Sequence, residues 1–117
     1  MKTIDRIFGW MLVIGALLHG AGSWKMLHDQ PSVLVWALAG SLAALMIAAV
    51  NLLRTGRPDD RGLAVVSLLG SLGWFAVSLE FGKTIGNELD FRVLWHAGCA
   101  FVLAYFSARS MMQARVP

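Results

Sequence analysis

Two histidines stand inside long apolar stretches of the sequence, where an ionisable side chain is unusual. His19 lies in the string ALLHGAGSWK and His96 in the string VLWHAGCA. An imidazole can take up a proton near neutral pH, ligate a metal ion, or donate and accept hydrogen bonds. An ionisable residue within a membrane-spanning segment is a functional hypothesis by default. These two residues are therefore the first candidates for chemistry.

The elements that hold these histidines are predicted to be transmembrane helices. Of the 117 residues, 57% are hydrophobic and 15% are charged, whereas soluble domains carry about a quarter charged residues. Charged side chains are absent from four segments, 7–24, 32–53, 62–79 and 93–108. Each segment, with one or two flanking residues, approaches the roughly 20 residues that cross ~30 Å of hydrocarbon as a helix.

We therefore expect an all-α polytopic membrane protein with helices at about 4–27, 32–53, 62–81 and 89–112, forming a single transmembrane domain of residues 1–117. The connections HDQPS, RTGRPDDRG and GKTIGNE are short. Short connections force sequential helices to lie antiparallel, which predicts an up-down-up-down bundle of four helices.

The distribution of basic residues predicts the orientation of this bundle. Three basic residues fall on one side of the expected helices, namely Lys25, Lys83 and Arg92. Seven fall on the other side, namely Lys2, Arg6, Arg54, Arg57, Arg61, Arg109 and Arg115. Positive charge collects in cytoplasmic flanks, so both termini are expected in the cytoplasm and the bilayer in question is a bacterial inner (plasma) membrane. The net charge of +3 is thus a topology signal and no sign of nucleic-acid binding.

Counting along the expected helices places the two histidines at equal depth. His19 and His96 lie about eight and seven residues from the outer ends of their helices, or ~10–12 Å at 1.5 Å per residue. Ser41 and Trp74 fall at a similar depth on the other two helices. Charged residues lie one or two turns nearer the outer surface, and Glu80 is expected to pair with Lys25 or Arg92. The predicted outward-facing polar site comprises His19, His96, Glu80, Lys25, Trp74 and Ser41.

Three functions fit this constellation. The first is binding or passage of a small polar ligand or cation at the intramembrane histidine pair. The second is a haem b or transition-metal site, for which His19, His96 and Cys99 are candidate ligands. The third is an accessory or assembly subunit without its own chemistry, held in a homo-oligomer or against a partner membrane protein through small-residue stripes. The imidazoles could also be purely structural and bond to each other, to Ser41 or to Trp74.

The sequence gives no positive sign of an enzyme. It contains no nucleophile–base motif, no phosphate-binding glycine loop and no cluster of carboxylates. Cys99 is the single cysteine, so an internal disulfide is excluded and the redox compartment stays open.

Overall fold

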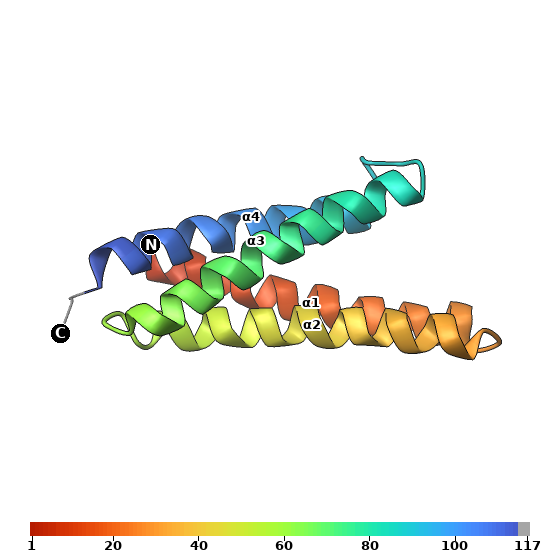
Figure 1. Ribbon diagram of the computed structural model, residues 1–117, viewed down its shortest axis with the longest axis horizontal. Coiled ribbons are helices and arrows are strands. Elements are labelled where there is room, and N and C mark those ends of the chain that lie inside the picture. The colour runs from red at the N-terminus through yellow and green to blue at the C-terminus, as the bar shows by residue number, and fades with distance from the viewer. Residues whose placement is uncertain (115–117) are drawn as a thin grey trace.

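The computed structural model describes residues 1–114, which are almost entirely helical (Figure 1). The helices are α1 (Lys2–Leu27), α2 (Pro31–Thr55), α3 (Arg61–Thr84) and α4 (Phe91–Gln113). All four are long and apolar enough to span a membrane. The prediction of an all-helical chain with four such helices is confirmed for this part of the chain. Arg115 lies outside the described residues.

The helix ends differ from their predicted positions by at most three residues, and local capping explains the differences. α2 begins at Pro31, which needs no N–H partner at a first helical position. α4 begins at Phe91 instead of residue 89, because the Asp90 carboxylate accepts a hydrogen bond from the backbone N–H of Arg92. α3 continues to Thr84, and the chain then turns at Gly86, whose φ of +70° favours glycine.

The four helices form two hairpins that pack against each other. Contacts are most extensive within the α1–α2 and α3–α4 hairpins, while the hairpins meet along α1–α4 and α2–α3. The assembly measures 52 × 24 × 21 Å. The hairpins lie close together near the N-terminus and diverge toward the turns that connect α1 to α2 and α3 to α4 (Figure 1).

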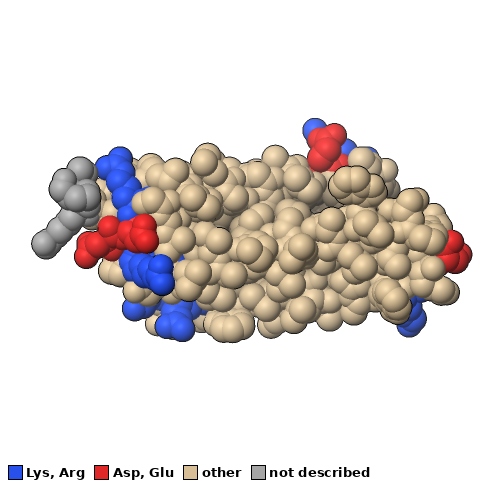
Figure 2. Space-filling model, turned by 60° about the horizontal axis from the view of Figure 1, so that its bottom comes forward, with Lys and Arg blue, Asp and Glu red and all other residues tan. Residues whose placement is uncertain are grey.

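Charged side chains gather at the two ends of the bundle, and the band between them is apolar (Figure 2). We call the end with the N-terminus and the α2–α3 turn the basic end, because most lysines and arginines lie there. The other is the opposite end. Large apolar side chains cover the outside, including Trp24 and Trp36, which are 63% and 79% exposed. Such a surface is far more apolar than that of a soluble monomer.

Small residues fill the interior. The core cluster consists of Leu12, Ala16, Ala44, Ala48, Cys99 and Leu103, each at most 2% exposed. Small side chains allow helix backbones to approach closely. In a soluble bundle most large apolar side chains are buried, whereas here many of them lie on the outer face and most core residues are small.

Candidate functional site

His19 and His96 meet in one layer to which every helix contributes a side chain. The ring centroids of the two imidazoles lie 6.2 Å apart, and the ring planes make an angle of 76°. His19 Nδ1 lies 2.6 Å from Ser41 Oγ on α2. Trp74 on α3 donates its indole N–H to His96 Nδ1 over 3.1 Å. We call His19, Ser41, Trp74 and His96 the histidine layer, and it unites four of the six residues expected in the site.

The hydrogen bond from Trp74 fixes the state of His96. An indole nitrogen can only donate, so His96 Nδ1 must accept and carry a lone pair. The ring is therefore neutral, with its hydrogen on Nε2. The other edge of the ring faces the backbone of Gly15, since a Cβ there would lie 3.2 Å from His96 Cε1. His96 is 9% exposed, so it is a buried and fully oriented imidazole.

His19 is the more accessible of the two imidazoles, and its hydrogen bonding leaves one nitrogen free. Ser41 Oγ donates to the backbone carbonyl of Ala37 over 3.4 Å. A hydroxyl has a single hydrogen, so when Ser41 donates to Ala37, His19 Nδ1–H donates to Ser41 and Nε2 carries the lone pair; when Ser41 donates to Nδ1, the hydrogen is on Nε2. No hydrogen bond within residues 1–114 uses this Nε2. The half-buried His19 thus presents a ring nitrogen that has no hydrogen-bond partner in the described part of the chain.

Glycines border the histidine layer on both helices of the α1–α2 hairpin. A Cβ at Gly20 would lie 3.3 Å from Ser41 Oγ and would crowd the hydroxyl. A Cβ at Gly40 would lie 3.9 Å from both His19 Cε1 and Trp74 Cη2, which is ordinary van der Waals contact.

The remaining expected site residues do not join this layer. Glu80 pairs with Lys83 over 3.6 Å, and both side chains are more than 60% exposed. Arg92 pairs with Asp90 over 3.0 Å, and its hydrogen bonds lower the pKa of the Asp90 carboxyl. Lys25 is exposed. The predicted ion pair of Glu80 with Lys25 or Arg92 is therefore wrong, because each charge finds a nearer partner or water at the end of its own helix.

The described side chains do not form a cluster that could hold a metal ion. Within residues 1–114 no three His, Cys, Asp or Glu side chains are grouped closely enough to hold a metal ion. Cys99 is 2% exposed and packs in the apolar core cluster. A histidine that ligates a metal normally donates its other ring N–H to an acceptor, whereas His96 Nδ1 accepts from Trp74. If His96 ligated a metal through Nε2, its hydrogen would have to lie on Nδ1. The Nδ1–H would then face the indole N–H of Trp74, and two donors cannot form a hydrogen bond with each other.

A second polar cluster lies near the basic end, and the sequence reasoning missed it. The guanidinium of Arg54 donates to both carboxylate oxygens of Asp5, over 2.7 and 2.8 Å. It also donates to Asn51 Oδ1 over 2.9 Å and to Ser110 Oγ over 3.1 Å. Arg54 is 1% exposed, and Asp5 is 6% exposed. A fork-to-fork pair of this kind is among the strongest polar contacts in proteins.

Asn51 extends this cluster to the second hairpin. Its Nδ2 donates to Ser71 Oγ over 3.0 Å, and its Oδ1 accepts from Ser107 Oγ over 3.0 Å. We call Asp5, Asn51, Arg54, Ser71, Ser107 and Ser110 the Arg54 network. It joins all four helices, and only the Nε of Arg54 is buried without a partner within the described residues.

One sequence signal points to the two α2 residues of this network, Asn51 and Arg54. Small and polar residues follow one face of α2, at Ala37, Ser41, Ala44, Ala48 and Asn51. One further turn along that face leads to Arg54. We interpreted Arg54 as a flanking charge because it lies at a helix end. Its partner Asp5 is 49 positions away, and no local pattern connects them.

The bundle therefore has two polar layers separated by the apolar core cluster. Within the described residues, the buried Nε of Arg54 is without a partner in the Arg54 network, and the partly accessible Nε2 of His19 is without one in the histidine layer. No family model, characterised protein or solved structure is found to match this chain.

Proposed function

We propose that this chain is a multi-pass protein of a bacterial inner membrane, with its basic end and both termini in the cytoplasm. Four helices with the length and apolarity of membrane spans support the placement. The gathering of lysines and arginines at one end supports the orientation (Figure 2). On this orientation the histidine layer lies toward the outer face, where the hairpins diverge.

We propose further that the histidine layer binds a small polar ligand that enters from the outer side. The observation that carries this proposal is the unoccupied Nε2 of His19 beside a partner imidazole that Trp74 holds neutral. Hydrogen bonds made within a low-dielectric layer are stronger than those made in water. A ligand with a hydroxyl, amide or ammonium donor would bind to this nitrogen.

The layer is better suited to a neutral or protonated donor than to a metal cation. A metal ion would need several lone pairs, and only one nitrogen of the two rings offers a free one. A donor ligand needs one acceptor and a shaped apolar surround, which Trp74 and Gly40 supply beside His19. Sites of this kind place a few polar groups among apolar walls.

Binding is favoured over passage through the bundle. Between the histidine layer and the Arg54 network lies the core cluster, where Leu12 and Leu103 are 0% exposed. A polar solute that crossed this layer would lose its hydration without gaining hydrogen bonds, at several kcal/mol per unsatisfied group. In this conformation the core cluster closes the bundle between the histidine layer and the basic end.

Retention of a native ligand tests the proposal. The full chain would be purified in a mild detergent and analysed by native mass spectrometry as wild type, as His19→Ala and as His28→Ala. His28 is an exposed turn residue whose ring contacts the Lys25 carbonyl, so it is a matched control. We expect a bound small molecule in the wild type and the control that is lost from His19→Ala. Identical spectra of all three proteins would contradict the proposal.

The same preparation tests the accessory-subunit alternative. Gly73 and Gly98 lie on exposed faces and have open space where a Cβ would be, so a second helix could approach them closely. Recovery of the chain in a fixed ratio with a larger membrane protein, without any small molecule, would favour a partner subunit over a ligand site. A homo-oligomer would be seen directly as a multiple of the chain mass.

A further inference from the structure

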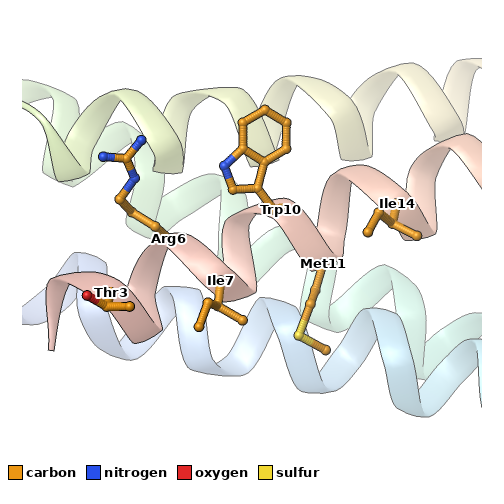
Figure 3. A pocket seen from close by; sticks show the side chains of 6 residues that line it. All are labelled: Thr3, Arg6, Ile7, Trp10, Met11 and Ile14. Carbon is orange, nitrogen blue, oxygen red and sulfur yellow. The ribbon is translucent and has the colours of Figure 1, made fainter.

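A hollow lies along the exposed side of α1, near the basic end (Figure 3). It has a volume of about 420 Å³, within the range of small-ligand sites. Its lining comes from one helix and consists of Thr3, Arg6, Ile7, Trp10, Met11 and Ile14. We call this the α1 groove. Its lining residue nearest to His19 in the chain is Ile14, about one and a half helical turns away, and no residue of the histidine layer lines it.

Arg6 brings an uncompensated positive charge to this groove. It forms no ion pair within residues 1–114, where the ion pairs are those of Arg54, Lys83 and Arg92. The neighbouring acid, Asp5, faces the interior and is held by both guanidinium nitrogens of Arg54. The Arg54 network thus removes the one carboxylate of α1 from the surface and leaves Arg6 free to bind an anion.

The polarity of the groove changes along its length. Thr3 and Arg6 lie at the basic end, and Trp10 lies one turn further along, on the same side of α1 as Arg6 (Figure 3). Ile7, Met11 and Ile14 continue the lining with apolar side chains. From Arg6 to Ile14 the helix rises by about 12 Å. An occupant must therefore be anionic at one end and apolar over at least that length.

We propose that the α1 groove binds an anionic phospholipid of the cytoplasmic leaflet. The phosphate lies at Arg6, with Trp10 at the level of the headgroups, where indole rings are favoured. An acyl chain follows Ile7, Met11 and Ile14 toward the middle of the bilayer. Charge complementarity distinguishes this occupant from an ordinary zwitterionic lipid, because basic side chains attract anionic lipids at the cytoplasmic surface. The inference uses the membrane placement proposed above and is independent of the histidine layer.

The test compares two lipids with identical acyl chains, phosphatidylglycerol and phosphatidylcholine, added to the full chain in a neutral detergent. Bound lipid is counted by native mass spectrometry, and the variants are Arg6→Gln and Arg61→Gln. Arg61 is an exposed arginine at the same end, on α3 and outside the groove. We expect the wild type and Arg61→Gln to bind one phosphatidylglycerol preferentially, and Arg6→Gln to bind it about fivefold more weakly.

Three results would overturn the proposal. Equal binding of the two lipids would show an ordinary lipid shell. Equal weakening by both substitutions would show a diffuse surface charge in place of a site. Glycerophosphoglycerol, which lacks acyl chains, should not displace the bound lipid, and efficient displacement would show a site for the phosphate alone. A chain that stays in solution without detergent would instead overturn the membrane placement, which is a distinguishable outcome.

Discussion

The Arg54 network allows a quantitative prediction about stability. Asp5→Ala removes the carboxylate that accepts two hydrogen bonds from Arg54, over 2.7 and 2.8 Å. Hydrogen bonds to charged groups contribute about 1.5–3 kcal/mol each. The guanidinium is 1% exposed, so water cannot replace the lost acceptor. Breaking a buried ion pair from one side costs about 3–5 kcal/mol, and we expect a loss of unfolding free energy in this range.

A double substitution separates the effect of an unpaired buried charge on stability from the effect of lost packing. In Asp5→Leu/Arg54→Met both charges are replaced by apolar side chains, and exchanges of this type are often neutral or stabilising. We expect the double variant to recover more than half of the loss caused by Asp5→Ala. The recovery is incomplete because Asn51 and Ser110 also lose the hydrogen bonds they accept from Arg54.

The assay is denaturant unfolding of the full chain in detergent micelles, followed by tryptophan fluorescence. Lys83→Ala is the control, because it removes the exposed ion pair with Glu80 and should change stability by under about 1 kcal/mol. The reasoning is refuted if Asp5→Ala is no more destabilising than this control. It is also refuted if the double variant is as unstable as Asp5→Ala, since an uncompensated buried charge would then not explain the loss.

Three further predictions concern the histidine layer. Gly15→Ala should destabilise the protein by about 1–3 kcal/mol, because the new Cβ would lie 2.8 Å from the Trp95 ring. Gly98→Ala is the control: a Cβ there would meet open space, so thermal unfolding should show a neutral or slightly stabilising effect. Trp74→Phe removes the indole donor and should move the His96 hydrogen between its ring nitrogens, which ¹⁵N chemical shifts would report; unchanged shifts would contradict the assignment of Nδ1 as an acceptor. Diethyl pyrocarbonate should modify His19 faster than the buried His96, as mapped by peptide mass spectrometry, and the reverse order would refute the accessibility of His19.

The histidine layer could be predicted because it depends on depth alone. In helices of fixed rise, a count from the chain turns places His19, Ser41, Trp74 and His96 at similar heights, and stripes of small residues indicate which faces turn inward. Helix geometry is nearly invariant, so the error in such a count stays within about a turn. Bonds from the imidazoles to Ser41 and to Trp74 were expected under the structural alternative, and both are found. Which histidine bonds to which partner could not be predicted, since it depends on how the helices rotate about their axes.

The charged residues were predicted less well because several partners compete for each of them. Glu80 and Lys83 are one turn apart on the same helix, and this neighbour replaces the interhelical partner that depth alone indicated. Arg54 presents the opposite case, since a charge at a helix end is usually a solvated flank. Only the packing of α1 against α2 shows that Asp5 faces it. The depth of a residue in the bundle follows from its position along its own helix, whereas the partner of a charged residue depends on how the helices pack together.

The placement of Asp5 and Arg54 in the same hairpin has a consequence for biosynthesis. α1 and α2 precede α3 in the chain, so on the proposed topology the first hairpin can enter the membrane ahead of α3. Both members of the ion pair are then present, so the nascent hairpin can neutralise its own interior charges at once. The second hairpin contributes only the hydroxyls of Ser71, Ser107 and Ser110 to the junction. The buried charge of Arg54 therefore has its partner, Asp5, within the part of the chain that is translated first.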